Sequence, residues 1–310
     1  MSFVNRYGYT DYDEERTNLL LRILSLTWFT LKNQIWGQRS VIISLALLLF
    51  VSLILVLPFG VKASLERHLA GEITEDEDTG DFFALAPFED IFKLIFITYS
   101  TNFFLLLLFG FIGARIFAED IETNVIENYY TRIPRYGYVS AKTLAVFLSY
   151  ITVVLIPVLM IWVWLGSAWR EDLWQSTNVD LITQTIFFAI LLCVFYTAVA
   201  LGVSASTENK NYAMTVFIVG LVVAGPLVTN ILAEITSNDY WLLLNIQEML
   251  SPIYWDTVGP PALEDRTLAP ILASEYERMV DLDPQDAINL MLIVFAVCFF
   301  QVYRKILQRG

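Results

Sequence analysis

The sequence has few of the residues that most often perform catalysis or hold metals. Its 310 residues include two cysteines and one histidine, His68. Cys193 and Cys298 both lie in apolar segments, so we expect two small buried side chains rather than a disulfide framework. A Walker A phosphate loop, a zincin motif and a Gly-x-Ser-x-Gly turn are all missing. These absences disfavour an ATPase or an intramembrane enzyme, and we expect neither a cofactor nor a metal site in this chain.

Charge is also scarce. Charged residues make up 16% of the chain and hydrophobic residues 56%, whereas soluble domains have about 25% and about 45–50%. Six apolar segments have roughly the 20 residues needed to cross a bilayer, and such spans are helices. These six are residues 41–60, 91–113, 144–165, 181–203, 213–232 and 287–303. The sequence therefore predicts an all-α membrane protein with six transmembrane helices, the fifth bent or broken by Gly220, Gly225 and Pro226.

Basic residues are concentrated in segments that would share one side of the membrane. With residue 1 inside, the inner segments carry 13 of the 19 Lys and Arg, and the outer segments carry 23 of the 32 Asp and Glu. The inner segments are 1–40, 114–143, 204–212 and 304–310. Because Lys and Arg favour the cytoplasmic side, we expect both termini in the cytoplasm and a multi-pass protein of the plasma membrane. The net charge of −13 excludes the basic balance of a nucleic-acid-binding protein.

The chain divides into four parts. Residues 1–40 form a cytoplasmic tail and, over 17–39, an amphipathic helix lying in the membrane interface; the alternative is a plain extension of the first span. Residues 41–232 hold the first five spans. Residues 233–286 form an extracellular segment, and 287–310 form the sixth span and a basic cytoplasmic tail.

Two local patterns are informative in the outer segments. In the segment 233–286 we expect a short helix capped by Asn238 or Asp239, then a turn-rich stretch over SPIYWDTVGPP, and Asp283 as the N-cap of the last span. The acidic run 72–81 is expected to be a solvated loop.

Uncharged polar residues occur within the spans, although the span middles lack Asp, Glu, Lys and Arg. That lack argues against an ion-coupled transporter. Polar groups in spans most often join helices by hydrogen bonds, and the alternative is that they line a translocation path. The candidates for that path are Tyr99, Asn102, Tyr196, Thr197 and Asn230.

The connector between the second and third spans, residues 119–142, has a pattern typical of a docking element. Asn124 and Glu127 fit a capping box, which predicts a short helix near 124–133 that Pro134 ends. Its apolar and aromatic face consists of Ile126, Tyr129, Tyr130 and Ile133, and its polar rim of Glu119, Glu122, Glu127, Arg132 and Arg135. Aromatic centres with charged rims are typical of protein interfaces. The alternative is a helix on lipid headgroups, with Arg132, Arg135 and Lys142 binding anionic lipid.

This connector resembles the loop between the second and third spans of type-2 ABC exporter permeases, which has an acidic turn, a Gly-Thr, a short coupling helix, a Pro-x-x-Arg/Lys turn and a Lys opening the next span. The matching residues here are Glu119, Glu122, Pro134, Arg135 and Lys142. Thr123 and Asn124 replace the Gly-Thr. The resemblance extends to the amphipathic N-terminal helix, the six spans and the long outer segment before the last span.

The resemblance implies one half of a permease. Two such chains would pair, as a homodimer or a heterodimer, around a path gated by residues 233–286. Each would dock a separate ATPase subunit, two copies per complex, through residues 119–135, and ATP and Mg would bind to those subunits. The cargo is left open by the sequence. The competing hypothesis is a membrane scaffold or assembly factor that binds partner proteins without transporting anything.

Overall fold

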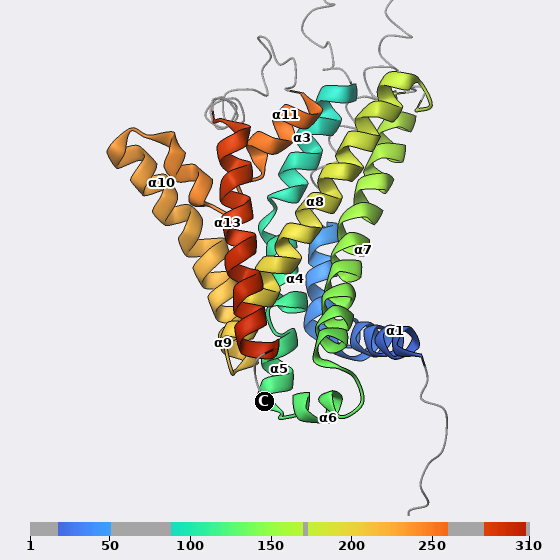
Figure 1. The fold of residues 1–310 in the computed structure, drawn as a ribbon. Coiled ribbons are helices and arrows are strands. Elements are labelled where there is room, and N and C mark those ends of the chain that lie inside the picture. The colour runs from blue at the N-terminus through green and yellow to red at the C-terminus, as the bar shows by residue number, and fades with distance from the viewer. Residues whose placement is uncertain (1–17, 51–87, 170–172, 260–281, 308–310) are drawn as a thin grey trace, which may run out of the picture.

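The computed structural model describes residues 18–50, 88–169, 173–259 and 282–307. Within these ranges every regular element is a helix, arranged as a bundle with the connector at one end and α11 near the other (Figure 1). The elements are α1 (Leu19–Phe29), η2 (Thr30–Ile35), the helix Arg39–Phe50, α3 (Phe88–Ser100), α4 (Phe103–Gly113), α5 (Ile116–Glu122), α6 (Ile126–Tyr130), α7 (Arg135–Trp169), α8 (Ser176–Ser206), α9 (Lys210–Thr215), η3 (Val216–Ala224), α10 (Gly225–Thr236), η4 (Asp239–Leu244), α11 (Ser251–Val258), α13 (Pro284–Val302) and η5 (Tyr303–Leu307).

The long apolar helices confirm an all-α membrane protein. Four continuous helical stretches have the length and composition of a span, and the bent pair formed by Phe88–Ser100 and Phe103–Glu122 makes a fifth. The first predicted span, 41–60, is described as far as Phe50, where the apolar helix Arg39–Phe50 meets the undescribed residues 51–87. The acidic run 72–81 and His68 also lie outside the described residues.

The second predicted span is bent by 44° between α3 and α4. The bend lies at Asn102, whose extended backbone stops the first helix and whose side-chain oxygen accepts a hydrogen bond from the amide of Phe104 at 2.8 Å. Asn102 is therefore the N-cap of α4. Its amide group, which is costly to leave unpaired in lipid, is used to begin a helix within the membrane-spanning region.

Two prolines within spans leave backbone carbonyls without their usual helical donors. Pro157 lies inside α7 and frees the carbonyl of Val153, which accepts a hydrogen bond from the Tyr99 hydroxyl at 2.8 Å. Pro226 frees the carbonyl of Val222, which accepts from the Gln247 side chain at 2.9 Å. Since lipid offers no donors, each proline is accommodated by a polar side chain from another element.

The fifth predicted span is continuous from Lys210 to Thr236, rather than broken. Its middle, η3, is a π-helix, and the amide of Gly225 bonds to the carbonyl of Gly220 five residues earlier. The wider π-helical turn thus lies directly before Pro226, and the carbonyl that this proline frees is bonded by Gln247 as described above.

The N-terminal helix is a separate element and not an extension of the first span. Asn18 caps α1, and a turn at Trp36 and Gly37 separates η2 from the helix Arg39–Phe50. In Figure 1, α1 lies across the bundle while that helix runs along it. Large apolar side chains of α1, such as Leu20 and Trp28, are 65% exposed. This geometry excludes a plain extension of the first span, and the position of α1 in the membrane interface stays a prediction.

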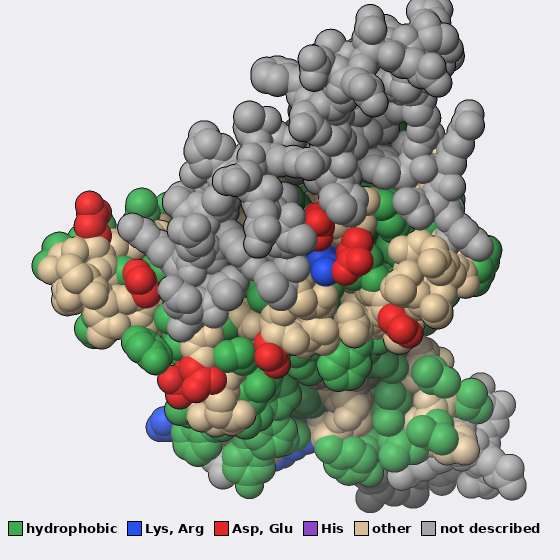
Figure 2. All heavy atoms as spheres, turned by 90° about the horizontal axis from the view of Figure 1, so that it is seen from above, with side chains coloured by type: hydrophobic (Ala, Val, Ile, Leu, Met, Phe, Trp, Pro, Cys, Tyr) green, Lys and Arg blue, Asp and Glu red, His purple; other side chains and the backbone are tan. Residues whose placement is uncertain are grey.

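The described part of residues 233–286 contains more helix than the sequence predicts. Asn238 caps η4 as expected, but η4 is a 3₁₀ turn of six residues. SPIYWDTV, expected to be turns, forms α11 with its proline in the first turn, where no amide donor is needed. Asp283 is confirmed as the N-cap of α13. Seen from the α11 end, acidic side chains are scattered over the described surface (Figure 2).

The core is centred on α8. In the most apolar stretch of α8, 61% is buried, against 11% for the Pro284–Leu307 helix. Close approach depends on two glycines: a Cβ added at Gly113 would lie 2.2 Å from the Tyr150 hydroxyl, and one at Gly202 would lie 2.8 Å from Sγ of Cys298. Small residues allow such close packing of helices in membranes.

Candidate functional site: the connector between α5 and α7

Asn124 ends α5 instead of beginning α6. Its φ of 54° is left-handed, and its amide bonds to the carbonyl of Ile121 while the amide of Val125 bonds to Asp120. This pair of bonds is a Schellman motif, in which Asn is tolerated in place of the usual Gly. The predicted capping box is therefore wrong, and α6 is a single short helix of five residues, Ile126–Tyr130, without a side-chain cap.

The apolar and aromatic face of the connector packs into its own chain. Ile126 and Ile133 are buried, and Tyr129 and Tyr130 pack partly buried against the core. The two isoleucines are therefore closed to a partner, whereas the two tyrosines keep part of their surface exposed. Docking of a partner at these residues stays a prediction.

Beneath this face lies a buried ionic cluster, which we call the Asp120 cluster: Gln34, Asp120, Tyr138 and Lys142. The Asp120 carboxylate accepts from Lys142 Nζ at 2.6 Å, from the Tyr138 hydroxyl at 2.6 Å and from Gln34 Nε2 at 3.0 Å. Lys142 also donates to Gln34 Oε1. The side chains of Asp120 and Lys142 are 2% and 0% exposed. Each charge is thus paired and hydrogen-bonded, as burial requires.

The aromatic residues of the connector cover this cluster. The Lys142 ammonium lies 5.5 Å from the centre of the Tyr129 ring, and that ring stacks on Tyr138 with centroids 5.5 Å apart. The pKa of Tyr129 is raised above its ordinary value because the phenol is partly buried and also faces the charge of Asp120. Tyr129 is therefore a neutral lid, and Lys142 has no access to lipid headgroups.

Two acidic residues of the predicted polar rim, Glu119 and Glu122, form bonds within the chain. Glu119 pairs with Arg115 at 3.1 Å and with Lys210 at 3.3 Å, and Glu122 accepts from the backbone amide of Lys210 at 3.1 Å. These bonds join α5 to the start of α9. Both carboxylates, expected on a docking rim, thus hold α5 and the start of α9 together within the same chain.

The other end of the connector is tied to both terminal helices. The Tyr130 hydroxyl donates to the carbonyl of Ile306 at 2.9 Å, and Arg135 donates to the carbonyl of Leu307 at 3.0 Å. The Arg22 guanidinium of α1 donates to the carbonyl of Arg132 at 2.7 Å. Pro134 precedes α7, which begins at Arg135. The connector is therefore held by α1, α5, α7 and η5 together.

The surface that the connector leaves open is polar. Its exposed residues on and just after α6 are Glu127, Asn128, Thr131 and Arg132. The side chains of Glu127 and Arg132 carry opposite charges. Of the predicted rim, these two residues remain available to a partner.

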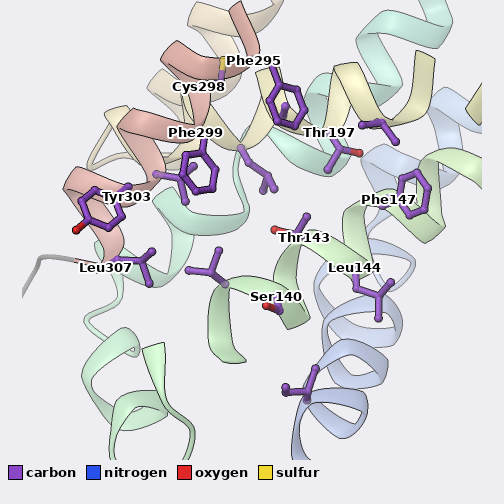
Figure 3. Close-up of a pocket in the computed structure, with 16 residues that line it drawn as sticks. Ser140, Thr143, Leu144, Phe147, Thr197, Phe295, Cys298, Phe299, Tyr303 and Leu307 are labelled. Atoms are coloured by element: carbon purple, nitrogen blue, oxygen red, sulfur yellow. The ribbon is translucent and has the colours of Figure 1, made fainter. Parts of the chain in front are cut away.

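The five residues expected along a path lie in different surroundings. Tyr99 and Asn102 serve the backbone bonds described above. Tyr196 is buried and donates to the carbonyl of Ile246, and Thr197 donates to the carbonyl of Cys193 within its own helix. Asn230 is exposed and bonds within α10. Tyr99 and Tyr196 each bond to another element, Asn102 caps α4, and of the five only Thr197 lines the groove shown in Figure 3.

Sequence reasoning missed Gln34, Asp120 and Tyr138. A signal was present, because Tyr138 and Lys142 are four residues apart and share a helix face, and Asp120 ends the preceding span. Gln34 had no signal, since its partner lies 86 residues away.

Within the described residues, no group of three or more His, Cys, Asp and Glu side chains could hold a metal ion. No protein-family model matches the chain, and no curated protein is significantly similar to it. The argument for function therefore stands on the residues and their geometry.

Proposed function

We propose that this chain is the membrane-spanning subunit of an ATP-driven ABC transporter, working as an exporter, with the connector as the element that a separate ATPase subunit pushes. Its resemblance to type-2 exporter permeases suggests this role, and the ties of the connector support it. A second copy or a sister chain completes the complex, which sits in the plasma membrane with both termini in the cytoplasm.

The observation that carries the proposal is that the connector is fastened to four elements of the bundle at once. A force on a loosely tethered loop would move only the loop. A displacement of α6 acts on α7 through the contacts of Tyr129 with Tyr138 and Lys142, on η5 through Tyr130, and on α1 through the bond from Arg22 to the carbonyl of Arg132. The Asp120 cluster in turn joins α7 to α5 and η2, and Arg135 joins α7 to η5. Such a connector can convert a local push into rigid-body movement of helices.

The surface offered to the ATPase is the polar strip with Glu127 and Arg132, rather than the tyrosines. The Tyr129 and Tyr130 side chains pack inside the chain, so their loss would damage the connector itself and would report on stability as well as docking. Charge reversal on the exposed strip tests docking alone. The main-chain carbonyl of Arg132, which accepts from Arg22, is kept when the side chain changes.

The test is a mild-detergent purification of the tagged chain from its own host, with ATPase activity measured on the eluate. The wild type is expected to bring down an ABC ATPase. The double variant Glu127→Lys/Arg132→Glu is expected to lose most of that activity. Lys32→Glu, an exposed charge change on η2, is the control and should retain it.

Purification of the wild type without any ATPase would refute the transporter and favour the scaffold hypothesis. Full ATPase recovery with the double variant would refute the docking strip while leaving the transporter intact.

A further inference from the structure

A groove of 620 Å³ lies between α7, α8 and α13 (Figure 3). Ile23 of α1 and Leu307 of η5 line it at the connector end. Its α13 wall includes Phe295, which is 39% exposed, and Phe299, which is 64% exposed, so the groove opens to the outside of the bundle. The volume falls within the range of about 300–1,000 Å³ typical of small-molecule sites.

The shape and lining of the groove suit a hydrocarbon chain. Lining residues run from Ser140 to Phe147 along α7 and from Phe295 to Tyr303 along α13, which corresponds to about 10–12 Å at 1.5 Å per residue. Most of the lining is aliphatic or aromatic. One of its few hydroxyls, that of Thr197, is already bonded to the carbonyl of Cys193. Because α7, α8 and α13 have the length and composition of membrane spans, we infer that the part of the groove away from the connector lies at the depth of lipid tails.

Several basic residues are neighbours in sequence of the residues that line the connector end of the groove, although none of them lines the groove itself. The Arg135 guanidinium bonds to the carbonyl of Leu307, a residue of the groove, and Arg22 directly precedes Ile23, another. Arg304 and Lys305 are exposed in the same turn as Tyr303. The Nε of Arg22 is buried and has no hydrogen-bond partner among the described residues. Exposed cationic side chains, those of Arg304 and Lys305, thus lie in the same turn as Tyr303 at this end of the groove.

We propose that this groove binds an anionic phospholipid of the adjacent leaflet, with one acyl chain along α7 and α13 and the headgroup beside Arg304 and Lys305. A hydrocarbon tail fits the slot, and the basic end prefers a headgroup with net negative charge. The lipid would stabilise the packing of α13, the least buried span, against α7 and α8. The site is separate from the exposed strip of α6 and does not depend on the transporter proposal.

The test compares phosphatidylglycerol with phosphatidylcholine, added at equal concentration to the purified full chain and counted by native mass spectrometry. The wild type is expected to retain phosphatidylglycerol preferentially. Ala198→Trp fills the groove and should lower that retention at least fivefold. Val228→Trp places the same side chain on the exposed face of α10 and should bind as the wild type does.

A second variant guards against a folding defect in Ala198→Trp. Arg304→Gln/Lys305→Gln changes only exposed side chains and should reduce the preference for phosphatidylglycerol by about 10- to 30-fold, with an unchanged thermal unfolding midpoint. Equal binding of the two lipids by the wild type would overturn the proposal. The proposal would also be overturned if Ala198→Trp retained phosphatidylglycerol as the wild type does. A second copy of the chain occupying the groove in place of lipid would overturn it as well.

Discussion

We predict that the free energy of unfolding depends strongly on the ion pair between Asp120 and Lys142. Replacing Lys142 with Met keeps the length and apolar stem of the side chain but removes its charge. The Asp120 carboxylate is then left 2% exposed with two neutral donors, Tyr138 and Gln34. Removing one partner of a buried pair typically costs about 3–5 kcal/mol, so we expect Lys142→Met to be destabilised by about that amount. Asp120→Asn should be comparably destabilised, because it leaves the ammonium unpaired.

The double variant Asp120→Asn/Lys142→Met separates pairing from simple loss of packing. It leaves no uncompensated charge, and replacing a whole buried pair is often close to neutral. We therefore expect the double variant to be more stable than either single variant, with a coupling energy of at least about 2 kcal/mol. The measurement is SDS-driven unfolding in mixed micelles, followed by tryptophan fluorescence.

Lys210→Met is the matched control. Lys210 also pairs with a carboxylate, that of Glu119 at 3.3 Å, but its side chain is 34% exposed. Exposed pairs are worth about 0–1 kcal/mol, so this variant should unfold nearly as the wild type does. Additive losses in the Asp120 and Lys142 variants, or equal losses at Lys142 and Lys210, would refute the reasoning that burial gives this cluster its strength.

Three further predictions concern backbone and packing. Gly202→Ala should lower the unfolding midpoint clearly, because its Cβ would press against α13, whereas Gly220→Ala, with no atom within 4 Å of the new Cβ, should change it little. Tyr99→Phe should lower the free energy of unfolding by about 1–3 kcal/mol, because it leaves a buried carbonyl unsatisfied. Tyr240→Phe, at an exposed position, should not change it. Equal unfolding free energies for the two variants would contradict this reasoning. Asn124→Gly should keep or raise the unfolding midpoint, and Asn124→Val should lower it. The reason is that a φ of 54° suits glycine and disfavours a β-branched residue. Equal unfolding midpoints for the two variants would argue against the left-handed turn.

The connector shows where sequence reasoning reaches its limit. The spacing of Ile126, Tyr129 and Tyr130 correctly placed these three on one face of a helix, since periodicity is local, but α6 ends at Tyr130 and Ile133 lies in the turn after it. Which way that face points depends on α5, α7 and η5, which arrive from elsewhere in the chain. Asn124 was misassigned because Asn both caps helices at their start and adopts the left-handed turn at their end.

The polar residues of the spans show the same limit. Tyr99 and Asn102 stood out because polar groups in lipid need partners. Their partners, however, are a carbonyl freed by a proline in another helix and the first turn of α4. In this bundle, polar residues that were expected to line a path instead form hydrogen bonds with backbone groups that have no helical partner.

Composition and apolar run lengths determined, from the sequence alone, that this is an all-α membrane protein, because a chain of this hydropathy has no other way to satisfy its backbone in lipid. Local chemistry also predicted the N-cap at Asp283 and restricted that of η4 to Asn238 or Asp239, since a cap bonds within three residues of itself. Only the tertiary structure decided that Asp120, Lys142 and Gln34 meet, that the tyrosines of the connector face inward, and that α7, α8 and α13 leave a groove. Each of these depends on contacts between residues distant in sequence, which neither spacing nor composition encodes.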